Sequence, residues 1–327
     1  MFDRIARGPA ATGARPNQVR TGILLAVGAA LISGLSIYVN AFAVKQLPDA
    51  AVFTTLKNAV AAGILVAAAL ALGAARDVRS IRHSSWPAIL AVGVVGGGIP
   101  FILFFVGLAQ ASAPSAAFIQ KTLFVWVALL AVPFLGERLG IIPVGALAVL
   151  LVGQALVMPP TGMRWGTGET LILVATLMWS AETIVVRHLL ASIPSHVMGA
   201  LRMGIGLVVL VAYLALSSKL SIVAGLSTLQ WTWALGTGVL LAGYVAAWFA
   251  ALRRAPASVV ASVLVLGAVV TGALTAVSKG AAPNPAVVGG YILIVVAAGA
   301  IAAWSIRSAR TASGAPDHAI QPNAVLD

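Results

Sequence analysis

The chain has 327 residues, of which 61% are hydrophobic and 9% are charged, against about 45–50% apolar and about 25% charged residues in an ordinary soluble domain. This composition excludes a soluble globular enzyme. The formal net charge of +12 comes from basic residues between apolar runs, which is typical of membrane topology and not of nucleic-acid binding. The chain has no cysteine, which excludes disulfides and thiolate metal sites.

Ten charge-poor segments follow one another along the chain, each close to the length of about 20 residues that crosses a bilayer. Prolines lie at or near the start of most segments, where a proline loses no helical hydrogen bond. The sequence therefore predicts an all-α integral membrane protein with ten transmembrane helices, over residues 21–44, 50–73, 86–109, 114–135, 141–158, 167–190, 195–217, 231–252, 256–277 and 285–306.

Basic residues divide unevenly between the two sides of these helices. With the N-terminus inside, thirteen arginines are cytoplasmic, namely Arg4, Arg7, Arg15, Arg20, Arg76, Arg79, Arg82, Arg138, Arg187, Arg253, Arg254, Arg307 and Arg310. The opposite side carries only Lys45, Arg164, Lys219 and Lys279. The positive-inside rule therefore predicts cytoplasmic termini in the inner (cytoplasmic) membrane. Residues 1–20 and 307–327 are expected to be cytoplasmic tails, the second one disordered, and 159–166 an external linker.

The two halves of the chain are similar to each other. A shift of 142 residues places Pro114 on Pro256 and Pro143 on Pro285. The repeats cover residues 21–158 and 167–306, five helices each. Because five is odd, the second copy enters the membrane from the opposite side, which predicts two inverted repeats as in many secondary transporters. A duplication without mechanistic consequence is the alternative.

Several short motifs occur along these predicted helices. Residues 113–117 read Ala-Pro-Ser-Ala-Ala. Residues 125–139 read VWVALLAVPFLGERL and include Pro133, Gly136 and Glu137, and two glycines, Gly145 and Gly153, follow this segment. Residues 178–181, at the opening of the second half, read Met-Trp-Ser-Ala. On these residues the chain resembles the EamA-type transporters of the drug/metabolite transporter superfamily, over essentially residues 20–306. The resemblance implies ten helices in two five-helix repeats and export of amino acids, other metabolites or drug-like amphiphiles.

The chain departs from the family pattern at two positions. The family usually has an arginine early in the second helix, where this chain has Lys57, and the second repeat has Lys279 where the first has Glu137. The role that the family assigns to the glutamate of the second repeat is therefore not carried over to this chain. Pro133, Gly136 and Glu137 are interpreted as a structural motif, in which Glu137 caps and orients the cytoplasmic end of the fourth helix.

Four ionisable residues lie deep in predicted helices, where a charge is costly and is a functional candidate. Glu182 and Arg202 fall at matching depth in the inner half, so we expect an ion pair, with a coupling role for Glu182 as the alternative. Lys57 and Lys121 fall in the outer half, where no acid has a matching depth. They are expected to bind a carboxylate-bearing solute. Their alternatives are snorkelling to the external interface, hydrogen bonding to free backbone carbonyls and, for Lys121, proton coupling.

Aromatic, glycine and amide residues give less specific evidence about the interior of the protein. Trp179, Tyr244 and Trp248 are candidates for lining a cavity that accepts an apolar or ring-bearing solute, with simple packing as the alternative. Glycines 96–98 precede Pro100 and indicate either a hinge in the third helix or close helix packing. Asn40 and Gln120 are interpreted as hydrogen-bonding between helices.

Motifs of metalloproteases and of phosphate-binding loops are missing from the sequence, and we expect no enzyme activity, no cofactor and no metal. The features together predict a secondary transporter, an exporter or exchanger of small organic solutes, that works by alternating access. Its expected partners are the solute and membrane lipid, and not nucleic acid. The alternatives are a non-transporting membrane protein, either an intramembrane enzyme or a lipid-handling scaffold, and a passive channel.

Overall fold

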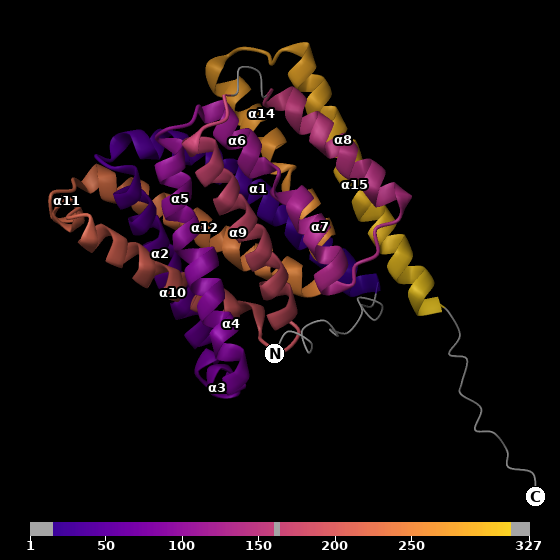
Figure 1. Cartoon of the computed structure of the whole chain (residues 1–327), viewed down its shortest axis with the longest axis horizontal. Helices are drawn as coiled ribbons and strands as arrows, with labels where there is room; N and C mark the ends of the chain where they lie inside the picture. The colour runs from indigo at the N-terminus through magenta and orange to yellow at the C-terminus, as the bar shows by residue number, and fades with distance from the viewer. Residues whose placement is uncertain (1–15, 160–163, 315–327) are drawn as a thin grey trace, which may run out of the picture.

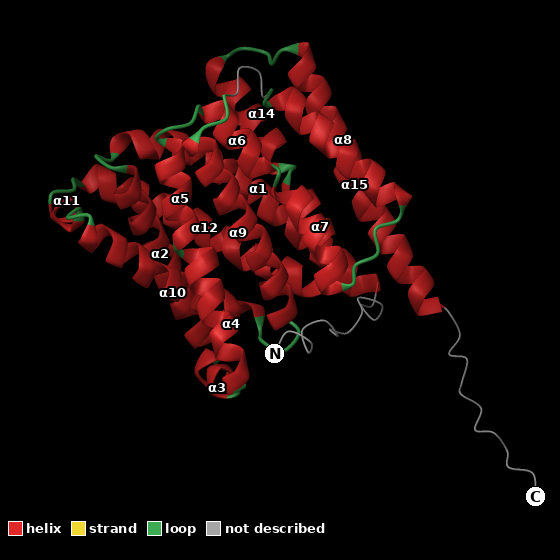
Figure 2. Ribbon diagram, viewed as in Figure 1, coloured by secondary structure: helices red, strands yellow, loops and turns green. Residues whose placement is uncertain are grey.

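Helices make up every regular element in the residues that the computed structural model describes, 16–159 and 164–314 (Figure 2). The first half forms α1 (Pro16–Gln46), α2 (Ala50–Ala71), α3 (Ala74–Arg79), α4 (Trp86–Ala91), α5 (Ile99–Leu108), α6 (Ala113–Lys121), α7 (Leu123–Leu135) and α8 (Ile141–Val157). The second half forms α9 (Thr167–Leu189), α10 (Ser195–Leu216), α11 (Leu220–Ala224), α12 (Thr228–Arg254), α13 (Ala257–Leu264), α14 (Gly267–Lys279) and α15 (Pro285–Gly314).

Nine helical segments of the described chain are long and apolar enough to cross a membrane, and α8, with 17 residues, is shorter. Several helices extend beyond the predicted boundaries, α1 and α15 the furthest. α1 begins at Pro16, and α15 continues to Gly314, so residues 307–314 are helical and the prediction of disorder was wrong there. An established helix gains one hydrogen bond per added residue, which favours such extension. Residues 1–15, 160–163 and 315–327 of the predicted tails and linker lie outside the described residues.

The fourth and ninth predicted helices are each broken into two. The first break, between α6 and α7, falls at Thr122, and the second, between α13 and α14, falls at Val265 and Leu266. Both α7 and α14 end at a glycine in the left-handed region, Gly136 with φ 66° and Gly280 with φ 59°. The two halves of the chain therefore contain a broken helix at the same place, a feature common at the solute sites of transporters.

Contacts between the two halves hold the molecule together. α1 packs against α12, α2 against α10, and α5 against α9, while α8 packs along α15. In Figure 1 the α8–α15 pair forms one edge of the molecule, and α2 and α10 lie toward the other edge. The short helices α3 and α11, which follow α2 and α10, lie at different ends of this second edge.

The third predicted helix contains a π-helical turn, Val92–Gly96, between α4 and α5, and its glycines touch the second half of the chain. A Cβ atom on Gly97 would lie 2.7 Å from the carbonyl oxygen of Arg202 and 2.9 Å from Cα of Gly206. A Cβ atom on Gly206 would lie 2.6 Å from Cα of Gly97. Backbone meets backbone at this crossing, which is the close packing that glycines permit.

An ion pair joins α2 to the α10–α11 connection at the end that the sequence predicts to be external. Lys219 Nζ lies 2.7 Å from Asp49 Oδ2, and Asp49 Oδ1 also accepts the N–H groups of Ala51 and Val52 at the start of α2. Partial burial raises the pKa of Asp49, but its bonds to Lys219 and the two N–H groups outweigh that and leave the pKa below its usual value. The hydrogen bond to Asp49 raises the pKa of Lys219. Both groups are therefore charged near neutral pH.

We expect Gly206→Ala to lower the free energy of unfolding by about 1–3 kcal/mol, because the added methyl group must push α10 away from the third helix. The matched control is Gly28→Ala in α1, where an added Cβ meets nothing within 4 Å and alanine favours the helix. Unfolding of both variants in mixed SDS and detergent micelles measures the difference. Equal stabilities would contradict the close crossing.

Candidate functional site

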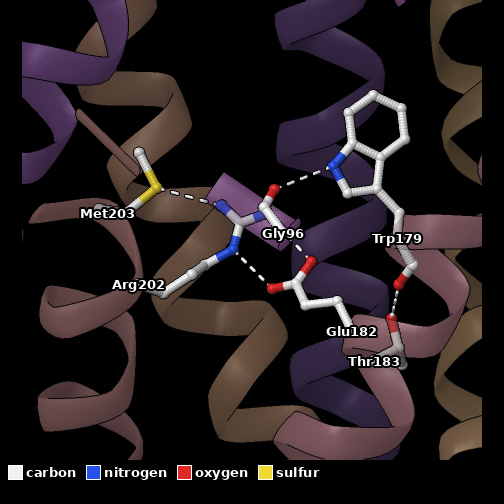
Figure 3. A network of polar contacts seen from close by, with 6 residues as sticks. All are labelled: Gly96, Trp179, Glu182, Thr183, Arg202 and Met203. Atoms are coloured by element: carbon white, nitrogen blue, oxygen red, sulfur yellow. Dashed lines mark hydrogen bonds and ion pairs between the residues drawn. The ribbon is translucent and has the colours of Figure 1, made fainter. Parts of the chain in front are cut away.

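The carbonyl oxygen of Gly96 is left without its helical partner by the local sequence. In an α-helix it would accept the N–H of residue 100, but residue 100 is proline, which has no N–H. Two side chains from the second half of the chain take that place. Arg202 Nη2 of α10 donates to this oxygen at 2.8 Å, and Trp179 Nε1 of α9 donates at 3.0 Å (Figure 3).

Arg202 also forms an ion pair with Glu182 of α9. Arg202 Nε lies 2.7 Å from Glu182 Oε1, Nη2 lies 3.2 Å from Oε2, and Nη1 lies 3.2 Å from the sulfur of Met203 (Figure 3). The side chains of Arg202 and Glu182 are 10% and 6% exposed. A Cβ atom on Gly96 would lie 2.0 Å from Cδ of Glu182, so only glycine fits beside the carboxylate.

A cavity of about 240 Å³ lies beside this network, between helices from both halves of the chain. It is lined by all seven residues that the sequence singles out for solute binding or ion pairing, namely Lys57, Lys121, Trp179, Glu182, Arg202, Tyr244 and Trp248. Residues at both helix breaks also line the cavity. Lys121 and Leu123 flank the break in the fourth predicted helix, and Leu264 and Val265 lie at the break in the ninth. The cavity therefore lies where the two broken helices meet.

Two lysines of the cavity have no anionic partner. Lys57 Nζ lies 5.3 Å from the centre of the Phe53 ring, one turn earlier in α2, a distance at which a cation is attracted to a ring. Among the described residues, neither Lys57 nor Lys121 has a side-chain hydrogen bond or an ion pair. With Arg202 matched by Glu182, the cavity has two unmatched ammonium groups.

Aromatic rings form two walls of the cavity. Trp179 meets Phe101 edge to face at 5.3 Å between ring centres and Phe104 at 5.8 Å. Tyr244 and Trp248 of α12 stack at 6.2 Å. Rings in these arrangements attract one another beyond their buried area, and they leave apolar surface beside the charged groups.

Polar residues of α1 complete the lining, and sequence reasoning missed most of them. Ser33, Ser36 and Asn40 line the cavity, and Asn40 Nδ2 donates to Ser36 Oγ at 3.2 Å. Asn40 Oδ1 is buried without a partner among the described residues. The spacing of three and four residues on one face of an otherwise apolar helix is a signal that could have found them. Asn40 and Gln120, read as hydrogen-bonding between helices, instead line the cavity.

The side chain of Glu137 binds a different helix end from the predicted one. Its carboxylate accepts the N–H of Ala257 at 2.6 Å and that of Ser258 at 3.2 Å, and it also accepts the Ser258 hydroxyl. These groups begin α13, whose N-cap residue, Pro256, offers no side-chain acceptor. The expectation that Glu137 caps its own helix was therefore wrong, because the free N–H groups of α13 bind it instead. Gly136 ends α7, and Pro133 lies inside that helix.

We expect Glu182→Gln to lower the free energy of unfolding by about 3–5 kcal/mol, because it leaves the buried Arg202 guanidinium without a charge partner. Replacing both residues with leucine should recover much of this loss, and the double-mutant cycle measures their coupling. Asp77→Asn is the control, since Asp77 is 36% exposed and should cost less than about 1 kcal/mol. A cycle without coupling would contradict the pairing.

The chain matches the EamA-like transporter family over residues 20–158 and again over 166–303. A comparison with curated proteins finds no match. Twenty-nine chains of solved structures match; one of them, described only as "Crystal structure of protein", has a TM-score of 0.70 and 19% sequence identity over 90% of this chain and 99% of that one. That likeness shows a shared fold. The two family matches together cover most of the chain, which therefore belongs to the EamA-like transporter family and is a multi-pass membrane transporter of the drug/metabolite type.

Proposed function

We propose that the protein is a secondary transporter, an exporter or exchanger, that moves small organic solutes with an anionic group across the cytoplasmic membrane. The observation that carries this proposal is the cavity between the two halves, with two unmatched lysines beside aromatic walls. A solute carboxylate would offset the cost of holding these ammonium groups in the membrane. Amino acids, other metabolites and drug-like amphiphiles with a carboxylate are the candidate solutes.

The proposed topology has ten spans in two inverted repeats. At a rise of about 1.5 Å per residue, a helix as short as α8 spans about 25 Å, a mismatch that a locally thinner bilayer accommodates. With α8 as a span, each repeat has five helices and the second one is inverted. The matching breaks and the matching glycines, Gly136 and Gly280, support the repeat. The division into repeats 21–158 and 167–306, with cytoplasmic termini, is part of this proposal.

The two broken helices act as gates in the proposed mechanism. In α13, every residue from Ala257 to Val263 is buried, and Glu137 binds the start of the helix. In α6, Ala117, Phe118 and Gln120 are only partly buried, and the cap is the local Ser112 hydroxyl. This contrast supports a state closed at the cytoplasmic end by α13, with α6 as the gate that moves at the external end. Opening toward the cytoplasm would then require Glu137 to release α13.

The test of the solute proposal is counterflow into vesicles that contain the purified protein, with amino acids and their amides as matched solutes. Lys121→Met should weaken binding of the carboxylate solutes at least about ten-fold, because a charge-assisted contact is lost, while Lys121→Arg keeps part of the activity. Lys279→Met, at the exposed end of α14, is the control and should transport normally.

Normal transport of every solute by Lys121→Met would reject the anion site. A wild-type protein that gives downhill flux without counterflow would be a channel, and covalent change of the solute would indicate an enzyme.

The test of the gate uses a cysteine at Ala261, which lines the cavity on α13, in a chain without other cysteines. Glu137→Gln should speed its reaction with an impermeant thiol reagent from the cytoplasmic side at least about ten-fold, because the amide holds the start of α13 less tightly. Glu169→Gln is the control, since Glu169 is an equally buried acid that caps only its own helix. Unchanged labelling in Glu137→Gln would contradict the gate.

A further inference from the structure

A second hollow, of about 490 Å³, lies between α2, α3 and α10, and its lining includes the exposed apolar residues Val66 and Leu70. Small residues create it: Ala69 on α2, Ala74 on α3, and Ala200 and Gly204 on α10 all line the space. A Cβ atom added to Gly204 would meet nothing within 4 Å. This groove is distinct from the solute cavity and has the volume of an ordinary ligand site.

The corresponding space at the other end of the same helix pair is filled. There α11 follows α10 as α3 follows α2 (Figure 1). Its Ile222 and Val223 pack against a buried cluster that includes Phe53, Leu56 and Leu214. The Asp49–Lys219 ion pair closes that end further. The groove is therefore a local feature of one end, and the protein's own side chains do not fill it.

Three arginines without a side-chain partner among the described residues lie on α3 or just after it, and one of them reaches the groove. Arg79 is the one charged residue among those that line the groove. The side chains of Arg76, Arg79 and Arg82 have no hydrogen bond or ion pair within the described residues. The nearby acid, Asp77, instead lies 3.3 Å from His196 Nε2 on α10. The rim is thus complementary to an anion at the membrane surface.

We infer that the groove binds one anionic phospholipid, with an acyl chain between α2 and α10 and its phosphate on Arg79. Apolar walls at membrane depth suit an acyl chain, and a planar guanidinium suits a phosphate. A second copy of the chain fits less well, since a two-fold contact through this groove would bring the Arg79 side chains of both copies together. The proposed orientation places this end of α2 and α10 at the cytoplasmic side, so the lipid would belong to the inner leaflet; the rest of the inference does not depend on that orientation.

The experiment is native mass spectrometry of the detergent-purified full chain, titrated with phosphatidylglycerol or phosphatidylcholine that carry the same acyl chains. The wild type should retain one phosphatidylglycerol in preference to phosphatidylcholine. Gly204→Leu fills the groove and should weaken binding of this lipid at least about ten-fold. The control, Gly236→Leu, adds the same side chain at an exposed helix position where a Cβ also meets nothing within 4 Å and should bind normally.

Arg79→Gln tests the headgroup contact separately. It should reduce the preference for phosphatidylglycerol by about five-fold, the effect of one basic residue near an anionic lipid. The control, Arg253→Gln, changes another predicted cytoplasmic arginine, outside the groove, and should keep the preference. Equal binding of both lipids by the wild type, or unchanged binding by Gly204→Leu, would overturn the inference. A dimer that Gly204→Leu disrupts would also overturn it and assign the groove to a second copy. No readout depends on transport.

Discussion

The carbonyl oxygen of Gly96 is the point on which the arrangement of the cavity depends. Pro100 leaves it without a helical donor, and it accepts from Arg202 and Trp179, which lie on two different helices of the second half. An unpaired carbonyl or guanidinium in the membrane would be costly. Each group therefore removes the cost of the other, and the third helix, α9 and α10 are held at one spacing.

The rest of the cavity follows from that fixed spacing. Glycines at the crossing let α10 approach closely enough for Arg202 to reach both the carbonyl oxygen and Glu182. Trp179, held by its indole N–H, presents its ring to Phe101 and Phe104. Because Arg202 is already matched, the unmatched charge of the cavity lies on the two lysines of the first half. The solute is thereby proposed to meet ammonium groups on one side and rings on the other.

Some of this could be predicted from the sequence, and the reasons are physical. A polar side chain deep in an apolar helix has only the interior to face, so the sequence could assign Glu182 and Arg202 to the inner half of the interior and Lys57 and Lys121 to the outer half. It could not show that all four line one cavity. The break at Thr122 carries no proline or glycine signal, and the break at Val265 and Leu266 is followed only by Gly267, a residue type that is common in unbroken transmembrane helices. Apolar patterning therefore reads each pair of half-helices as one. The cap made by Glu137 joins residues 120 positions apart, and a sequence shows the acceptor without showing which helix end it reaches.

The most direct test of the central interaction is Pro100→Ala, which supplies an N–H that competes for the Gly96 carbonyl oxygen. Pro100 lies in the first turn of α5, where a proline costs a helix little, so helix propensity alone predicts almost no change in stability. We predict instead a loss of about 1–3 kcal/mol in the free energy of unfolding, because Arg202 and Trp179 lose their shared acceptor, together with a shift in tryptophan fluorescence. A Pro100→Ala protein that is at least as stable as the wild type, with unchanged fluorescence and transport, would contradict the central role of this carbonyl oxygen.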